Sequence, residues 1–338
     1  SHGCPEGLLA PVLQDLLEAI AADLDGADAP VATALLSSVA ALATACEADF
    51  APFYGSFMPG IQGLLSSNAA ALKAQNSDDP NADAAARKLY GRAMEVAGII
   101  GAAVGPEVFG PDAHVLMGLI VPALEANVAA AGKGSDSLFD HVLPGAGYIA
   151  RALGADFARY LPAVLPPLDA ALRAAPDFSF AMVDDEEGAD AEGDADMDET
   201  GLTTTVLNIP GQGRCRVTLN TAVVLERKTA CQIVYELAAG LGAAFASARL
   251  PALAGKAAGA WALEALLPNS VFKFSEDVRC AASLAVGEVF GACCESLQAP
   301  EGGLAPADVQ SMLAEVVAGL AAALKGDVLP DPRACAAE

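Results

Sequence analysis

The stretch Ala155–Leu172 reads ADFARYLPAVLPPLDAAL, and it decides how the rest of the chain is interpreted. A related stretch, ADFAPFYGSFMPGIQGLL, occurs 107 positions earlier at Ala48–Leu65. In the later copy, apolar residues recur at the three- and four-residue spacing that places side chains on one face of a helix. Asp156 stands at its start and is expected to cap the helix, because a carboxylate accepts from first-turn amides. Two copies of one amphipathic helix indicate a repeat protein.

A proline followed two residues later by an aliphatic residue marks the period of the repeat. This mark occurs in steps of 48, 63, 44 and 85 residues, at Pro11, Pro59, Pro122, Pro166 and Pro251. The two long steps contain insertions, a polar connector at 68–83 and an acidic, glycine-rich stretch after 177. Without the insertions, every step lies near the roughly 40–47 residues of HEAT and armadillo repeats. A proline inside a helix also kinks it, which suits a curved array.

Amphipathic segments predict about eleven helices in two interleaved series. The outer series is Gly7–Leu24, Phe50–Leu65, Asp112–Ala131, Phe157–Ala174, Phe245–Leu267 and Pro306–Leu324. The inner series is Pro30–Cys46, Ala84–Val104, Ser137–Leu153, Val224–Leu241 and Ser275–Cys294. Neither helix of a pair can bury its apolar face alone, so the pairs must stack. We therefore expect an all-α, right-handed α-solenoid of HEAT repeats, with five to six antiparallel helix pairs forming a single domain over 1–338.

An insertion at 177–222 interrupts the fourth helix pair. Its acidic run contains ten carboxylates and no base: Asp184, Asp185, Glu186, Glu187, Asp190, Glu192, Asp194, Asp196, Asp198 and Glu199. Such a run cannot bury apolar area, so we expect it to be mobile. After it, β-branched residues at 202–209 and 214–219 flank the turn Pro210–Gly213, which predicts a small β-hairpin.

The charge balance limits the classes of partner. Lys and Arg number 18 against 43 Asp and Glu, a net charge of −25. This excludes nucleic acid as a direct ligand, since phosphate binding requires a cationic surface. It favours basic partners, although solubility of an alanine-rich array is an alternative reason for the charge. We expect no membrane insertion, because no apolar run reaches the roughly 18 residues that a membrane span requires.

Cysteine and histidine positions give no sign of a metal, cofactor or catalytic site. The eight cysteines form no CxxC pair and lie mostly in apolar helices, which indicates buried thiols in a reducing compartment. The acidic run departs from a calcium loop at Ala195 and Gly201, where glycine and glutamate are required. The three histidines are far apart. We expect no cofactor and no enzymatic activity, and we expect Trp261 to fill the core.

A short motif at the start of the last inner helix supports the repeat assignment. The run Asp277-Val278-Arg279-Cys280-Ala281-Ala282 is similar to the Asp-Val-Arg-x-Ala-Ala that opens the second helix of HEAT repeats. We expect Asp277 to cap the helix and Arg279 to reach an aspartate of the neighbouring repeat. Small residues such as Gly287 would allow close packing against the preceding helix.

Three further motifs resemble the importin-beta superfamily, and within it the importin-five or karyopherin beta-3 class. They are EVAGIIGAAVGPEVF at Glu95–Phe109, YLPAVLPPL at Tyr160–Leu168 and LERKTACQ at Leu225–Gln232. The resemblance covers about Phe50–Cys294, and that class also has an acidic run before the third motif. The acidic run here is longer, and the turn at Pro210–Gly213 differs. The chain resembles a middle portion of such a receptor, without its amino-terminal repeats.

The resemblance implies a nuclear import receptor without catalytic activity. Its concave face would bind nuclear localisation signals of basic cargo, and its convex face would bind Phe-Gly nucleoporins. Ran GTPase in its GTP form would release the cargo, while the receptor, a monomer, shuttles between cytoplasm and nucleus. Two alternatives remain: a HEAT scaffold of another class, such as a phosphatase-type assembly platform, and an α/α-toroid enzyme. The enzyme would require an inward cluster of Glu, Asp and His.

The candidate partner-binding residues form two groups. The first group is the acidic run. The second consists of polar residues on two inner helices: Glu95, Glu226, Lys228, Gln232, Tyr235 and Glu236. The alternative role of the second group is an inter-repeat ladder and a solvated surface, where most exposed charges belong.

Overall fold

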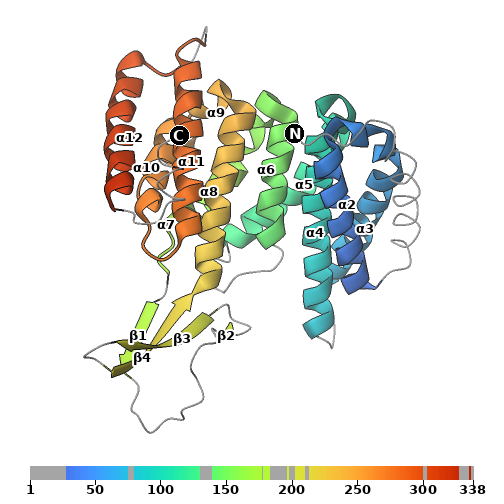
Figure 1. The fold of residues 1–338 in the computed structure, drawn as a ribbon. Helices are drawn as coiled ribbons and strands as arrows, with labels where there is room; N and C mark the ends of the chain where they lie inside the picture. Colours follow the sequence, from blue (N-terminus) through green and yellow to red (C-terminus); the bar gives the residue numbers. More distant parts are fainter. Residues whose placement is uncertain are drawn as a thin grey trace.

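The computed structural model describes residues 28–74, 80–129, 139–176, 178–182, 196–197, 202–209, 213–299 and 303–326, together with residue 335. The expected helix at Gly7–Leu24 lies outside these residues. Helices make up most of the described part, and one small sheet interrupts them (Figure 1).

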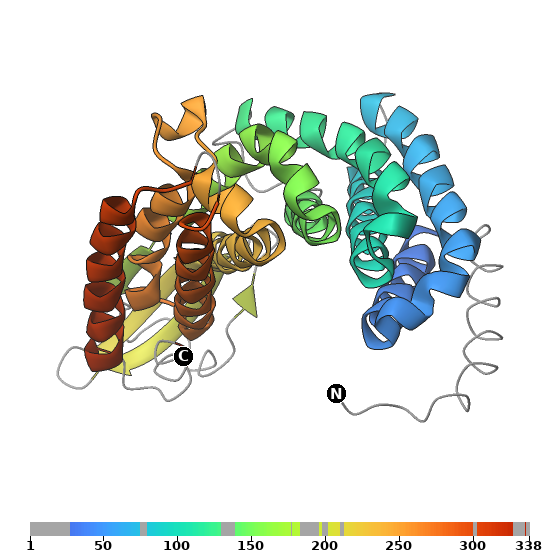
Figure 2. The same ribbon diagram turned by 90° about the horizontal axis from the view of Figure 1, so that it is seen from above.

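Five long helices follow one another along the concave side of an arc (Figure 2). Each of them packs against the next in the series. They are α2 (Ala29–Cys46), α4 (Pro80–Val104), α6 (Phe139–Leu153), α8 (Thr221–Leu241) and α11 (Glu276–Ser296). All five correspond to the predicted inner helices, so the inner series is confirmed.

A second layer of helices covers the convex side of the arc (Figure 2). It consists of α3 (Tyr54–Ala74), α5 (Pro106–Ala129), α7 (Leu161–Arg173), α10 (Ala258–Leu266) and α12 (Pro306–Gly326). These helices pack against inner helices, as α5 does against α4 and α6. The described residues thus contain the complete pairs α3–α4, α5–α6, α7–α8 and α10–α11, with α2 and α12 at the ends. The predicted all-α HEAT-repeat solenoid is confirmed.

One phenylalanine anchors the beginning of successive outer segments. Phe50, Phe109, Phe157 and Phe245 are all fully buried. Phe109 packs against Gly101 of the neighbouring inner helix. This position must be glycine, because a Cβ added there would lie 2.2 Å from the phenylalanine ring. The 107-residue echo in the sequence therefore reflects a repeated packing position, with Phe50 and Phe157 as its two copies.

The proline mark holds for three of its five positions. Pro59, Pro122 and Pro166 lie inside α3, α5 and α7, as expected for prolines that bend outer helices. Pro251 instead begins a short 3-10 helix, η3 (Pro251–Leu253). Pro11 lies outside the described residues.

The prediction that Asp156 caps a helix is wrong. Asp156 lies inside a 3-10 helix, η2 (Gly154–Tyr160), and α7 begins after it, at Leu161, with no side-chain cap. Pro162 occupies the first turn of α7, where a missing N–H costs nothing. The earlier copy behaves alike, since η1 (Glu47–Phe53) precedes α3. In both copies the predicted outer helix is therefore a 3-10 turn followed by an α-helix.

The single helix predicted at Phe245–Leu267 is also wrong. The chain there forms α9 (Ala243–Ser247), η3 and α10. Ala254 and Gly255 have φ values of 52° and 78°, and a left-handed backbone ends a right-handed helix. Gly242, at φ 51°, separates α8 from α9 in the same way.

Asp277 does not cap α11, contrary to expectation. Ser275 is the N-cap, and its Oγ accepts from the backbone N–H of Val278 at 3.3 Å. Asp277 instead forms an ion pair with Lys228 of the preceding inner helix. Arg279 donates from Nη1 to the backbone carbonyl of Phe272 at 2.9 Å. A link between repeats therefore exists, and the aspartate of the motif makes it through Lys228.

A four-stranded antiparallel sheet is inserted in the sequence between α7 and α8, and it lies below the helices in Figure 1. Its order is β1-β4-β3-β2, with β1 (Phe178–Met182), β2 (Asp196–Met197), β3 (Leu202–Ile209) and β4 (Gly213–Asn220). The predicted hairpin is confirmed as β3 and β4, which pair from Leu202 with Asn220 to Ile209 with Gly213. Strands β1 and β2 were not expected. Asn220 ends the sheet and caps α8, accepting from Val223 at 3.3 Å.

The expectation that no segment is apolar and long enough to span a membrane is wrong on length and composition. Three stretches meet both criteria: Ala29–Ser66, Pro106–Glu125 and Pro306–Gly326. Alanine is apolar but small, so alanine-rich helices reach the required hydropathy without large side chains. In this fold all three stretches are repeat helices, and each packs against neighbouring helices of the solenoid.

Candidate functional site

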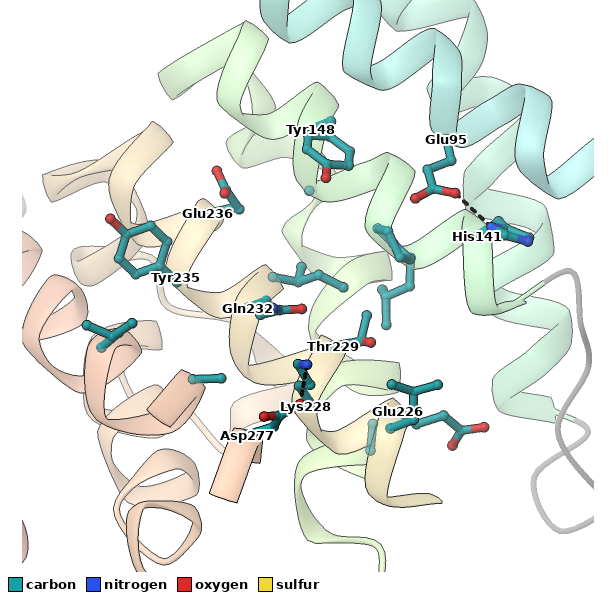
Figure 3. Close-up of a pocket in the computed structure, with 18 of the residues that line it drawn as sticks. Glu95, His141, Tyr148, Glu226, Lys228, Thr229, Gln232, Tyr235, Glu236 and Asp277 are labelled. Atoms are coloured by element: carbon teal, nitrogen blue, oxygen red, sulfur yellow. Dashed lines mark hydrogen bonds and ion pairs between the residues drawn. The ribbon is translucent and has the colours of Figure 1, made fainter. Parts of the chain in front are cut away.

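A groove runs along the concave side of the solenoid, over α4, α6, α8 and α11 (Figure 3). We call it the inner groove, and its volume is about 800 Å³. Leu143, Gly147, Ile233 and Ala281 contribute apolar surface to it. Polar and charged side chains from all four helices surround that surface. The inner groove is therefore a surface shared by successive repeats.

All six inner-helix residues predicted as partner contacts line the inner groove. They are Glu95, Glu226, Lys228, Gln232, Tyr235 and Glu236. Five of them lie on α8, and Glu95 reaches the groove from α4. The acidic run is different: apart from Asp196 and Met197 in β2, Asp184–Glu199 lies outside the described residues. Asp196 thus belongs to a strand, where a mobile segment was expected.

Glu95 is held by two bases at one end of the inner groove. Its Oε2 lies 2.7 Å from Arg92 Nη1 and 2.7 Å from His141 Nδ1. Burial raises the pKa of Glu95, but the His141 hydrogen bond and the charge of Arg92 together outweigh it and hold the pKa below its ordinary value. Arg92 also donates from Nε to Ser37 Oγ of α2 at 3.2 Å. Glu95 therefore stays ionised and joins three inner helices.

Glu236 occupies a contrasting position on α8. Burial raises the pKa of Glu236, the charge of Arg151 lowers it, and the charge of Glu288 raises it further. Tyr148 of α6 lies near this carboxylate (Figure 3), and burial together with the charges of Glu95 and Glu236 raises the pKa of its phenol. When a cation approaches a carboxylate whose pKa is raised, the cation stabilises the charged form of that carboxylate.

Asp277 and Lys228 define the end of the inner groove between α8 and α11 (Figure 3). Lys228 Nζ lies 2.5 Å from Asp277 Oδ2. Next to the pair, Leu225 and Leu284 are exposed although they are large and apolar. This end of the groove therefore offers both charge and uncovered apolar surface.

Sequence reasoning missed several residues of the inner groove. His141, Pro144 and Tyr148 line it from α6, and Leu284 lines it from α11. A usable signal was present in α6, because His141, Pro144 and Tyr148 recur at helical spacing on one face. Asp277 was assigned a capping role, so its place in the groove was not foreseen.

A second groove lies on the convex side, between α5 and α7. We call it the outer groove. It encloses about 650 Å³, and Met117, Val121, Pro122, Tyr160 and Pro166 are among the residues that line it. His114 Nδ1 and the Tyr160 hydroxyl form a hydrogen bond of 2.8 Å across it. The outer groove is a largely apolar surface with an aromatic ring at its edge.

Trp261 is buried as predicted. Its indole N–H donates to Asp169 Oδ1 of α7 at 2.7 Å, so Trp261 also links two outer helices.

In the part of the chain that the structure describes, no group of three or more His, Cys, Asp or Glu side chains could hold a metal ion.

Comparison with known proteins gives both curated relatives and solved structures. No protein-family model matches the chain. Importin subunit beta-3 of Saccharomyces cerevisiae is 26% identical over 246 residues, which is 73% of this chain and 20% of that protein. The chain therefore spans about a fifth of its relative's length. The match supports the importin beta-3 class suggested by the sequence motifs.

The solved structures share the fold of the whole described solenoid. Kap121p bound to the SUMO protease Ulp1p has a TM-score of 0.65 at 22% identity, covering 97% of this chain and 26% of Kap121p. Kap121p bound to RanGTP has a TM-score of 0.62 at 21% identity, covering 97% and 27%. The chain is thus similar in sequence to an importin of the beta-3 class, and it shares the HEAT-repeat fold of Kap121p.

Proposed function

We propose that the chain is part of a nuclear transport receptor and that its inner groove binds a basic segment of cargo. One observation carries the proposal: three of the four inner helices along the groove, α4, α8 and α11, place Glu95, Glu226, Glu236 and Asp277 around it. The net charge of −25 draws cations towards the molecule over a Debye length or so. The related receptors are transport proteins rather than enzymes, which supports a binding function without catalysis.

The form of the groove favours an extended segment over a compact domain. It passes over four helices that belong to four repeats, so its occupant must contact them in succession. Apolar side chains at its floor can take the aliphatic stems of lysines while carboxylates meet their ammonium groups. A nuclear localisation signal of basic cargo has this chemistry.

The acidic run at Asp184–Glu199 is proposed as a second contact for basic cargo, on the basis of its ten carboxylates. It precedes β3, which leads through the hairpin into α8, whose residues line the inner groove. Replacing the run with a Gly/Ser linker should weaken binding of a lysine-rich peptide and reduce the salt dependence of its affinity. Unchanged affinity at two salt concentrations would remove the run from the binding surface.

Release of cargo by Ran in its GTP form is proposed from the fold. Kap121p, which shares this solenoid, has been solved with RanGTP bound. Each interface between repeats is modest, so a change of curvature can spread over many repeats and reshape the inner groove. A receptor with such a cycle would shuttle between cytoplasm and nucleus as a monomer.

The outer groove is proposed to bind Phe-Gly nucleoporins. Met117, Val121, Pro122 and Pro166 give it the apolar lining that a phenylalanine ring requires. This second binding function separates a transport receptor from a HEAT scaffold of the phosphatase-platform type. Immobilised Phe-Gly repeats should retain the folded chain. If the folded chain passes through unretained, the scaffold alternative gains support.

The inner-groove proposal can be tested by neutralising two of its carboxylates. The variant Glu226→Gln/Glu236→Gln should bind a fluorescently labelled lysine-rich peptide about tenfold more weakly, because two ionic contacts of the bound state are lost. The matched control is Glu107→Gln/Glu315→Gln, which removes the same charge from outer helices. Equal weakening by both variants would show that only net charge matters and would contradict binding in the groove.

A further inference from the structure

Lys228 is a base on a surface where carboxylates predominate. From α8 its Nζ reaches Asp277 Oδ2 at the start of α11, at 2.5 Å. Both side chains line the inner groove (Figure 3). The Asp277 side chain is 64% exposed and the Lys228 side chain 31%. The carboxylate is thus within reach of a molecule in the groove, although a lysine of the same chain already contacts it.

Asp277 lies in the first turn of α11, where the helix dipole favours a negative charge, but it does not cap the helix. Ser275 caps α11, so the carboxylate of Asp277 is not tied to the helix start. Arg279, two residues further on, donates to the carbonyl of Phe272. The contact of Asp277 with Lys228 is therefore the ion pair that fixes its place in the groove.

We infer that Lys228 is an internal competitor for the basic segment, occupying Asp277 while the groove is empty and giving it up to a lysine of the cargo. The inference rests on the proposed function of the inner groove. The exchange replaces one ammonium–carboxylate contact with another, so a single lysine gains little at this position. Only a segment that makes further contacts along the groove displaces Lys228, which makes this residue a determinant of specificity.

Two other carboxylates of the groove, Glu95 and Glu236, support the inference by comparison. Glu95 is held by Arg92 and His141, as Asp277 is held by Lys228. Glu236 has Arg151 and Glu288 as charged neighbours, but among the described residues it forms no ion pair within 4.0 Å. Cargo can therefore contact Glu236 without a competing ion pair, whereas at Asp277 it competes with Lys228.

The test is a double-mutant cycle on peptide affinity. A fluorescently labelled lysine-rich peptide is titrated into the wild-type chain, Lys228→Met, Asp277→Asn and the double variant. Lys228→Met keeps the aliphatic stem and should bind the peptide about fivefold more tightly, since exposed ion pairs are worth at most about this factor. Asp277→Asn should weaken binding less than about twofold in the wild-type background, but about fivefold in the Lys228→Met background.

Two controls separate competition from general charge and from folding. Lys273→Met removes the same charge from an exposed turn next to α11 and should change the affinity less than about twofold. Thermal unfolding of each variant confirms that it is folded, and a role limited to joining α8 to α11 would move the melting temperature without moving peptide affinity.

The outcomes distinguish the inference from the function on which it rests. If the wild type binds the peptide and Lys228→Met binds equally or more weakly, the inference is overturned and the proposed function stands. Equal tightening by Lys228→Met and Lys273→Met, or an additive cycle, also overturns it. If neither the wild type nor Lys228→Met binds the peptide, the proposed function itself fails.

Discussion

Arg227 of α8 donates from Nη1 to the side-chain oxygen of Asn269 at 2.9 Å, and both residues are buried. Arg227 also donates to the backbone carbonyl of Ala174, at the end of α7, and its guanidinium stacks over the ring of Phe272 at 4.5 Å. Burial lowers the pKa of Arg227, but the group keeps its charge because arginine titrates far above neutral pH. Arg227 therefore joins Ala174, which precedes the sheet, to Asn269 and Phe272, which belong to the next repeat.

Replacing Asn269 should destabilise the solenoid strongly. Asn269→Leu removes the acceptor of Arg227 and the two bonds from Asn269 Nδ2 to the carbonyls of Leu172 and Ala265. A buried charge with one partner fewer costs about 3 kcal/mol in the free energy of unfolding. Denaturant unfolding at neutral pH measures it. Asn269→Asp keeps the acceptor and should lose less; if both variants lose equally, the bond to Arg227 is not the cause.

Close packing of inner helices predicts opposite effects for two glycines. A Cβ added at Gly98 of α4 would lie 2.8 Å from the carbonyl oxygen of Gly145 in α6, whereas one added at Gly287 would meet nothing within 4 Å. Gly98→Ala should therefore cost about 1–3 kcal/mol of stability. Gly287→Ala should add about 0.5–1 kcal/mol, since alanine favours helix over glycine. Thermal unfolding of both variants decides the matter, and destabilisation by both would contradict the packing described.

We expect Glu236 to lower the stability of the folded chain at neutral pH and to strengthen binding of a lysine-rich peptide. Its pKa is raised in the folded chain, mainly by burial. An acid of this kind binds more protons folded than unfolded, so stability falls as pH rises through the interval between the two pKa values. Glu236→Gln should thus unfold at a higher temperature than the wild type at pH 7, with a smaller difference at pH 4. The same variant should bind a lysine-rich peptide more weakly, and Glu315→Gln should do neither.

Cysteine reactivity should follow burial. Burial raises the pKa of Cys231 to about 12 and that of Cys293 to about 11, so their thiols stay protonated and inert at neutral pH. Cys280 and Cys294 are partly exposed. Iodoacetamide at pH 7.5, followed by peptide mass spectrometry, should label the second pair in the native chain and the first pair only after unfolding. Labelling of Cys231 at the rate of Cys280 would show that α8 is not packed as described.

The sequence was sufficient for the repeat architecture because its signals are periodic and local. Apolar spacing located the inner helices, and the 107-residue echo corresponds to two buried phenylalanines, Phe50 and Phe157. The hairpin was visible because β-branched residues flank a Pro-Gly turn. The same periodicity could not show where helices break, because the marks of the breaks, Pro251, Gly242 and Gly255, are single residues and are not periodic.

The candidate site was predictable in part, for a physical reason. Glu226, Lys228, Gln232, Tyr235 and Glu236 were found together because they are polar side chains of one predicted inner helix. The pairing of Lys228 with Asp277, 49 positions later, depends on how α8 and α11 pack. Pairing between helices has no local signal, and for that reason Asp277 was taken for a cap. His141, which completes the environment of Glu95, escaped notice likewise.

The central claim is that basic cargo segments lie in the inner groove, and photo-crosslinking tests it most directly. A lysine-rich peptide carrying a benzophenone group is bound to the full chain, irradiated, and its attachment points are mapped by mass spectrometry. We predict crosslinks on α6, α8 and α11, around Tyr148, Tyr235 and Leu284, and their loss in Glu226→Gln/Glu236→Gln. Crosslinks confined to the outer helices α5, α7 and α10, or to the acidic run alone, would contradict the claim.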